Sequence, residues 1–359
     1  MAARWRVNIR ACILFVKERV GDLGEEVLAS GFITVDIISA GLDKIPEPGE
    51  LVFAPLGVRI RLGGHPGNVS VDLVQMGLEA GVVGAAAAVG KDPMRDFVKK
   101  VLESKGVTAF LQEVDDAETG KTVILVVKNE DRRYINEPGA NLHLSYDFVL
   151  NALKRVKPRI FYIASGLLGD FDYRVWELLR ECKENGILTV VDLVRPFGKE
   201  WDFIHPALQY SDVLHCNVSE LEGITGGLAL EDGIKWLVKR GVKLPVISDG
   251  ERGLTAYFSE RIIRQPSFKV NVVDPTGAGD ALCAGIVYKL LMSARSGKRL
   301  EDLSLEEVVD MLLYGQASGA ACVEEIGTTP GVTAKRIREI LEEQSERVMS
   351  QMRIEEMKD

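Results

Sequence analysis

The chain has 359 residues, of which 46% are apolar and 27% are charged. This balance is typical of a globular protein with one large domain, or with a domain and a smaller lobe. Lys and Arg total 44 against 53 Asp and Glu, which gives a formal charge of −9. Because binding to nucleic acid or to an anionic membrane needs clustered cations, we expect neither as a partner.

The cysteines and histidines show no pattern of a disulfide framework or a metal site. The five cysteines are far apart and odd in number, and no two have Cys-x-x-Cys spacing. The four histidines form no His/Cys cluster along the sequence. We therefore predict a reduced, cytoplasmic protein without structural zinc.

Residues 1–25 form an N-terminal extension ahead of the domain pattern. Its apolar run, Ala11 to Val16, is ended by Lys17 and Glu18. Six apolar residues are too few for a signal-peptide core or a membrane span. We predict an extra strand or short helix here and no targeting role.

After Glu26 the hydrophobic pattern alternates between strands and helices. A β-branched run at 26–38 predicts a buried first strand, and loose alternation at 51–62 predicts a strand of a small sheet. Further strands are expected at 82–89, 122–127, 132–136, 159–163, 187–191, 212–216, 244–248, 253–258 and 262–266. Helices are expected at 66–80, 93–104, 145–155, 171–185, 218–225, 230–240, 277–294, 304–323 and 333–350.

This alternation predicts an α/β fold with a mostly parallel central sheet that is covered by helices on both faces. Two hairpin-like insertions, at about 40–62 and 110–137, are not followed by covering helices. We expect them to form a small β lid over one end of the main sheet. The main domain is predicted to span 26–345, and the polar residues 346–359 to form a frayed or loosely helical tail.

The segment with the most chemical content is NVVDPTGAGDALCAGIVYKLL, residues 271–291. A β-run is followed by a turn and a long apolar helix. Backbone N–H groups of Gly277, Ala278 and Gly279 at a helix start would form an anion site suited to a phosphoryl group. Asp280, in the first helical turn, could accept the proton of an attacking hydroxyl. A plain strand–turn–helix connection explains this local pattern equally well.

Two common nucleotide-binding motifs are absent from the sequence. Gly277-x-Gly279 is followed by Leu282, where a Rossmann fingerprint needs Gly or Ala. Gly120-Lys121-Thr122 is similar to the end of a Walker A loop, but Asp115 stands where the upstream Gly is required. The sequence therefore excludes a P-loop enzyme.

Several segments together resemble the PfkB (ribokinase-like) carbohydrate kinases. DPTGAGDALCAG, from residue 274, resembles the C-terminal signature of that family, and RLGGHPGNVSVDLVQMG, residues 61–77, resembles its N-terminal signature. Further matches follow in family order: the early strand with Gly31 and Asp36, AAVGKDPMRDF at 87–97, DRRYINEPGAN at 131–141, NVSELEGITG at 217–226, VISDGERG at 246–253 and GQASGAACVEEIG at 315–327. The resemblance covers about residues 28–335 and implies a ribokinase-like fold.

The resemblance also implies the chemistry, which is ATP-dependent phosphorylation of a hydroxyl on a sugar or sugar-like small molecule. It implies that Asp280 is the catalytic base and that the amides of Gly277, Ala278 and Gly279 stabilise the transferring phosphoryl. The residues implied to bind the acceptor are Asp36, Gly63, Gly64, Asn68 and Asn141. Those implied to lie along the nucleotide are Asn217, Ser248, Gly250, Gly253, Thr276 and Gln316. Glu220 is implied to help organise Mg²⁺ indirectly.

Structural roles stay open for several of these residues. Asn217 and Glu220 have the spacing of a helix capping box, which is compatible with a role near the metal. Asn68 could merely cap a helix. Asp36 is the hardest to explain structurally, because an unpaired carboxylate in an apolar strand is costly.

The sequence departs from the family pattern at places that shape specificity. The loop has Asp274-Pro275-Thr276 where the family often has Asp-Thr-Thr, which leaves open whether a monovalent cation binds beside it. Residues 192–196 lack an Asn found in many hexose and keto-sugar kinases. A nucleoside kinase, an inositol kinase and a non-catalytic ligand-binding regulator therefore remain alternatives. Lid sheets in this family often pair between subunits, so the resemblance implies a homodimer.

Overall fold

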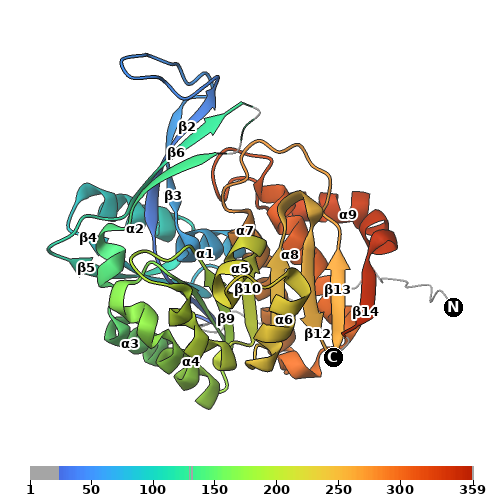
Figure 1. Cartoon of the computed structure of the whole chain (residues 1–359). Coiled ribbons are helices and arrows are strands. Elements are labelled where there is room, and N and C mark those ends of the chain that lie inside the picture. The colour runs from blue at the N-terminus through green and yellow to red at the C-terminus, as the bar shows by residue number, and fades with distance from the viewer. Residues whose placement is uncertain (1–23, 129, 131, 358–359) are drawn as a thin grey trace.

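The computed structural model describes residues 24–128, 130 and 132–357 (Figure 1). The predicted strand or helix at 11–16 lies outside these residues. Among the described helices, none is both long enough and apolar enough to cross a membrane.

The larger sheet has ten strands in the order β14-β13-β12-β11-β10-β9-β8-β1-β4-β5 (Figure 1). The strands from β11 to β5 run parallel, and β12, β13 and β14 add antiparallel strands at one edge. Their bounds are β1 Val27–Ser30, β4 Val83–Gly90, β5 Thr108–Val114, β8 Ile160–Ser165, β9 Leu188–Leu193, β10 Val213–Asn217, β11 Leu244–Ser248, β12 Leu254–Phe258, β13 Arg261–Gln265 and β14 Arg353–Glu356.

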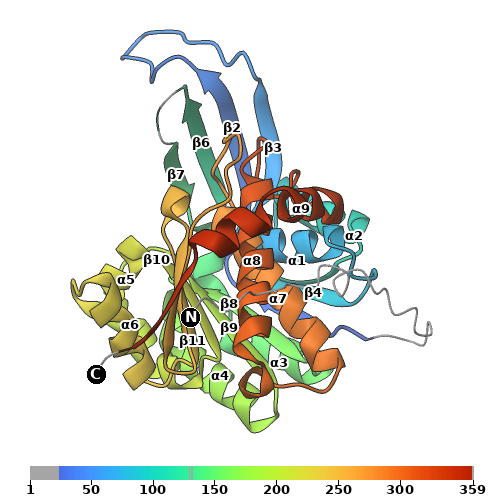
Figure 2. The same ribbon diagram turned by 90° about the vertical axis from the view of Figure 1, so that its right-hand side faces the viewer.

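Helices cover both faces of this sheet, as the sequence predicts (Figure 2). One face carries α1 (His65–Gln75), α2 (Pro93–Ser104), α7 (Ala278–Arg295), α8 (Leu305–Cys322) and α9 (Ala334–Gln351). The other carries α3 (Tyr146–Val156), α4 (Val175–Glu184), α5 (Val218–Thr225) and α6 (Leu230–Lys239). Because both faces are covered, a central strand such as β8 is buried along its whole length.

The smaller sheet is the predicted lid, and it rises from one end of the main domain (Figures 1 and 2). Its four strands lie in the order β3-β2-β6-β7. Their bounds are β2 Thr34–Leu42, β3 Val58–Gly63, β6 Lys121–Val127 and β7 Arg133–Glu137.

The face of the lid toward the main domain is polar at its base and apolar farther out. At the base, one cross-strand row runs Arg61, Asp36, Thr122, Asn136, and buried Asp36 turns this row toward the main domain. Farther out on the same face, Ile38, Ala40 and Ile124 pack with Ile326. The neighbouring row consists of Ile60, Ile37, Val123 and Ile135. Successive residues of a strand point to opposite faces, so this apolar row faces away from the main domain.

The first predicted strand is in fact two strands. The chain breaks at Gly31, which has a φ of +144°, and a Cβ there would lie 2.9 Å from the carbonyl oxygen of Ala164. Asp36 therefore lies on lid strand β2 and does not interrupt a strand of the core.

Two further boundaries are corrected. The second lid insertion begins at β6 and not at residue 110, because 108–114 form β5 and pair with β4 in the main sheet. The tail predicted to be frayed or loosely helical is helical as far as Gln351, where α9 ends, but it then forms strand β14, which pairs with β13.

Candidate active site

The predicted anion loop lies at the start of α7 and is held by a buried carboxylate. Asp274 accepts hydrogen bonds from Thr276 N at 3.0 Å, Thr276 Oγ1 at 2.6 Å and Gly327 N at 3.0 Å. Gly277 caps the helix with a left-handed φ of +83°, and a Cβ there would lie 2.8 Å from the side chain of Thr328. The first N–H groups of α7 have no acceptor within the helix, so the loop presents donors to an anion.

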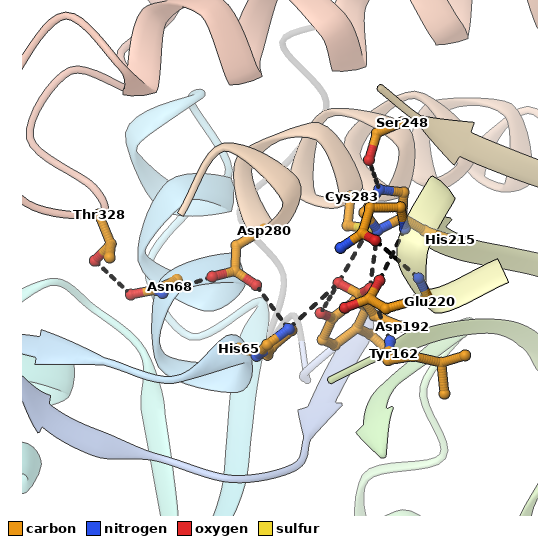
Figure 3. A network of polar contacts seen from close by, with 12 residues as sticks. His65, Asn68, Tyr162, Asp192, His215, Glu220, Ser248, Asp280, Cys283 and Thr328 are labelled. Carbon is orange, nitrogen blue, oxygen red and sulfur yellow. Dashed lines mark hydrogen bonds and ion pairs between the residues drawn. The ribbon is translucent and has the colours of Figure 1, made fainter. Parts of the chain in front are cut away.

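Asp280 is buried in the first turn of α7 and has one oxygen held and one without a hydrogen bond (Figure 3). Its Oδ2 accepts from Asn68 Nδ2 at 2.7 Å, and Asn68 Oδ1 accepts from Thr328 Oγ1 at 2.6 Å. Its Oδ1 has no hydrogen-bond partner. Burial raises the pKa of this carboxyl above its ordinary value, as a group that accepts a proton requires.

The predicted acceptor residues of the lid base lie against α1. Gly64 caps α1, and a Cβ there would lie 2.4 Å from the carbonyl oxygen of Phe32. A Cβ on Gly63 would lie 2.1 Å from Asp36 Oδ2, so glycine is required for the carboxylate to fit. Asp36 accepts a hydrogen bond from Thr34 Oγ1 at 2.9 Å, and burial raises its pKa to about 6.

A second polar cluster, missed in the sequence, lies beside Asp280 where the parallel strands end (Figure 3). Asp192 of β9 accepts hydrogen bonds from Tyr162 OH of β8 at 2.9 Å and from its own neighbour Leu193 N at 2.8 Å. His215 Nδ1 of β10 lies 2.8 Å from Asp192 Oδ1, and its Nε2 lies 3.0 Å from Ser248 Oγ.

The Asp192–His215 contact is a buried ion pair. Burial alone would lower the pKa of His215, but the carboxylate of Asp192 outweighs it and raises this pKa. Burial alone would raise the pKa of Asp192, but the charge and hydrogen bond of His215 hold this pKa well below its ordinary value. Each charge thus compensates the desolvation of the other.

Two triplets here have the composition of metal sites. Asp192, His215 and Cys283, and likewise His65, Asp192 and Asp280, place ligand atoms within 4.8 Å of one another. Asp192 belongs to both triplets, and both of its oxygens already accept hydrogen bonds. We therefore assign the cluster to hydrogen bonding and charge compensation. The sequence did not reveal this cluster, because the histidines form no His/Cys cluster along the chain.

The predicted nucleotide residues Asn217, Ser248 and Gly250 line an open hollow of about 360 Å³. The other lining residues are Val218, Ser219, Glu222, Asp249 and Arg252. His215 connects this hollow to the anion loop, because a Cβ on Gly279 would lie 3.2 Å from His215 Cε1. Asn217 and Glu220 also form the capping box of α5, with bonds of 2.9 and 2.8 Å.

Not every residue predicted to bind the acceptor or the nucleotide lies where a ligand could contact it. Asn141 is fully buried, and its amide holds Ile33 N, Ile33 O and Pro138 O at 2.8–2.9 Å. Both of its donors are thus used by the backbone at the lid base, which corrects its assignment as an acceptor-binding residue.

Three residues that we predict to lie along the nucleotide have contacts that indicate structural roles. Gly253 lies in the β11–β12 turn, where a Cβ would lie 2.0 Å from the carbonyl oxygen of Gln265. Gln316 Nε2 donates to the same oxygen at 3.4 Å, so these two residues lie together but do not line the hollow. The hydroxyl of Thr276 donates to Asp274, which makes it a support of the anion loop.

Some of the missed residues had a signal in the sequence. Asp192 is a carboxylate near the end of an apolar strand, and the ends of parallel strands meet at one edge of a sheet. His65 lies inside the N-terminal signature itself, and His215 comes two residues before Asn217. Tyr162 and Thr328 had none, because they become polar partners only through contacts far apart in sequence.

An α/β fold with a lid, a donor-rich helix start and a buried carboxylate beside it is the arrangement expected of a phosphotransferase. The chain belongs to the pfkB family of carbohydrate kinases, whose model matches residues 26–335. It is 26% identical to fructokinase-2 of Oryza sativa subsp. japonica in an alignment 324 residues long that covers 85% of this chain and 90% of that protein. It is also 26% identical to mouse ribokinase over 322 residues, covering 86% and 92% of the two chains.

The fold agrees with the family. Ribokinase from Giardia lamblia superposes with a TM-score of 0.76 at 18% identity, over 88% of this chain and 99% of that chain. The predicted family, fold class and enzyme class are therefore confirmed: the chain is an ATP-dependent carbohydrate kinase with a ribokinase-like fold.

Proposed function

We propose that this kinase transfers the γ-phosphoryl of ATP in line to an acceptor hydroxyl, with no phospho-enzyme, and that Asp280 is the base. The observation that carries this proposal is the asymmetry of the Asp280 carboxylate. Oδ2 is held by Asn68, and Oδ1 lies beside the donor-rich start of α7 without a hydrogen bond. A hydroxyl bound at Oδ1 would give its proton to Asp280 as its oxygen attacks phosphorus.

The anion loop would stabilise the charge of the transferring phosphoryl. The Gly277–Gly279 amides and the α7 dipole are already oriented, so no reorganisation is needed during the reaction. Mg²⁺ would be organised through water by Glu220, whose Oε2 accepts a hydrogen bond from Asn217 N at the start of α5 and whose carboxylate is a ligand type that Mg²⁺ prefers. When bound with the nucleotide, that ion would neutralise phosphate charge.

The acceptor is proposed to be a neutral sugar or polyol. The face of the lid toward the site is polar at its base, where Asp36, Thr122 and Asn136 are cross-strand neighbours. Paired carboxyl, hydroxyl and amide groups suit several adjacent hydroxyls. A nucleoside kinase would need an apolar surface for the base beside these groups. The apolar residues farther out on this face, Ile38 and Ile124, are already buried against Ile326, so inositol is the better-fitting alternative acceptor.

The test is ATP consumption with Mg²⁺ across pentoses, hexoses, inositols, keto-sugar acids and nucleosides. Each acceptor is run in parallel with Asp280→Asn, which keeps the fold of the site but removes the base. We expect one neutral polyhydroxy acceptor to exceed the ATPase background in the wild-type chain only. Equal consumption by both chains for every acceptor would contradict catalysis and favour the ligand-binding regulator.

We further propose a homodimer that pairs lid to lid. In the apolar row of the lid, Ile60 is 48% exposed and Ile135 is 64% exposed. Two exposed isoleucines at the sheet edges are an unfavourable surface for a monomer and a suitable one for a second copy. Light scattering on Ile60→Asp/Ile135→Asp should show a monomer where the wild type is a dimer. A dimer in both would contradict this interface.

A reducing, cytoplasmic setting is proposed as well. Cys182, Cys216, Cys283 and Cys322 are free and buried in the described part of the chain. Activity unchanged by a thiol reductant, with these four thiols titrated only after unfolding, would agree with this setting.

A further inference from the structure

His65 lies between two buried carboxylates at the acceptor side of the site (Figure 3). It is the first residue of α1, directly after Gly64. Its Nε2 is 3.5 Å from Asp280 Oδ1 and 3.8 Å from Asp192 Oδ2. The ring packs against Phe32 with centroids 4.7 Å apart, which fixes the imidazole in this position.

Neither carboxylate depends on His65 for its structural hydrogen bonds. Asp192 is held by Tyr162 and His215, and Asp280 Oδ2 is held by Asn68. The oxygen nearest to His65 is Asp280 Oδ1, which is the one without a hydrogen bond. His65 Nε2 therefore lies closest to Asp280 Oδ1, the atom that would accept the proton in the proposed reaction.

We propose that His65 is a positioning residue for the base, shared between Asp280 and Asp192, which orients Asp280 Oδ1 and favours its ionised form. This proposal rests on the proposed role of Asp280. Without the imidazole, Asp280 Oδ1 would lose its 3.5 Å contact, and the repulsion between the carboxylates of Asp280 and Asp192 would be less screened in this low-dielectric site.

The surrounding charges act in the direction that the proposal requires. Burial raises the pKa of Asp280, attraction to His65 lowers it, and repulsion from Asp192 raises it. The hydrogen bond from Asn68 and the charge of His215 lower it as well, but they come after His65 in size. Loss of His65 therefore removes the largest lowering effect, so Asp280 would be protonated at a higher pH and would be a weaker base near neutral pH. The other titratable groups facing the cluster are Asp36 on β2, Asp72 on α1, Tyr162 on β8, His215 and Cys216 on β10, Glu220 on α5, Cys283 on α7 and Cys322 on α8.

The kinetic test compares His65→Gln and His65→Ala with His143→Gln, which removes an exposed imidazole far from the cluster. For an accepted sugar, kcat and the acceptor KM are measured from pH 5.5 to 9. We expect the pH at which kcat falls on the acidic side to be higher in both His65 variants. At low pH, their kcat should be lower than that of the wild type by roughly tenfold for each pH unit of this shift. Acceptor KM should change little, and added imidazole should restore part of the rate of His65→Ala.

A different kinetic result would overturn the proposal. A raised acceptor KM with an unchanged pH profile would make His65 a substrate contact. Unchanged kcat, KM and pH profile, with the variants folded by circular dichroism, would leave His65 without a role in the reaction.

A second readout needs no turnover. In protein labelled with ¹³C-carboxyl aspartate, the Asp280 signal is assigned by its loss in Asp280→Asn, and its pKa is measured in wild type and His65→Gln. We expect a higher pKa of Asp280 in His65→Gln. If that shift is seen but no acceptor is phosphorylated by the wild type, the proposed function fails and the His65 coupling stands. No shift would refute the coupling itself.

Discussion

The acceptor side and the nucleotide side of the site are built in different ways. On the acceptor side, functional groups are buried and held by other side chains: Asp280 by Asn68, and Asn68 by Thr328. On the nucleotide side, Asn217 and Gly250 line an open hollow, and Arg252 pairs only with neighbouring Asp249 among the described residues.

This difference follows from what each side has to do. Proton transfer needs a carboxylate fixed to a fraction of an ångström and shielded from water, because small displacements cost large factors in rate. A nucleotide makes many weak contacts with an open surface, so no single contact dominates. Substitutions on the acceptor side and in the anion loop should therefore have larger effects than those in the hollow.

Among substitutions that leave the base in place, the largest effect is expected for Gly277→Val in the anion loop. The new side chain would require a left-handed φ of +83° and would collide with Thr328. Displacing the helix-start donors should lower kcat roughly 10²–10³-fold, the usual cost of losing such a donor. The matched control is Gly226→Val, since Gly226 has a φ of +74° but no atom within 4 Å of a Cβ. Equal loss of kcat in both variants would show that backbone strain alone is responsible.

Asp36→Asn should change how stability depends on pH. The pKa of Asp36 is about 6 in the folded chain against an ordinary 3.8. The folded state therefore binds this proton more tightly, so the group stabilises the fold below pH 3.8 and loses that contribution as pH rises to about 6. In urea unfolding, the stability of Asp36→Asn relative to wild type should rise by about 2–3 kcal/mol from pH 4 to pH 7. A constant difference across this range would contradict the raised pKa.

Asn68→Leu should weaken the support of the base. It removes the 2.7 Å hydrogen bond to Asp280 Oδ2 and leaves the carboxylate without that donor. A hydrogen bond to a charged group contributes about 2 kcal/mol, so kcat/KM should fall roughly thirtyfold. Steady-state kinetics with a fixed ATP concentration provide the measurement. Asn185→Leu, which replaces an exposed amide at the end of α4, should leave kcat/KM unchanged.

Arg252→Ala should have the smallest effect. Its side chain is 74% exposed and is paired with Asp249 at the rim of the hollow. Because exposed charge pairs contribute little, we expect the KM for ATP to rise less than about fivefold at unchanged kcat. A fall in kcat as large as that of Gly277→Val would contradict the proposed difference between the acceptor side and the nucleotide side.

The sequence predicted most of the fold because its strands and helices have clear hydrophobic periods. The helix predicted at 277–294 is α7, Ala278–Arg295, and the strand at 244–248 is β11. The errors lie where local pattern is ambiguous: β1 and β2 form one apolar run, and only the close approach of Gly31 to Ala164 separates them. Strand β14 has a polar sequence and is held in the sheet by its pairing with β13. No local sequence pattern predicts this pairing.

The site was predictable as far as its motifs extend. Asp280 and Asn68 come from two different signatures. They are 212 residues apart in the sequence, and in the structure one hydrogen bond connects them. Asn141 was assigned by its position in a motif, but its contacts with Ile33 show a backbone-holding role. The buried pair Asp192–His215 was missed because each residue stands alone in the sequence, and only the sheet order brings their strands together.

The most direct test of Asp280 as the base separates binding from turnover in Asp280→Asn. Calorimetric titration with ATP and Mg²⁺ is paired with single-turnover phosphorylation of the accepted sugar by the same preparation. We expect ATP affinity within a few-fold of wild type and a phosphorylation rate lower by roughly 10²–10⁴-fold, the usual contribution of a general base. A rate close to that of the wild type, with ATP bound normally, would contradict Asp280 as the group that takes the proton.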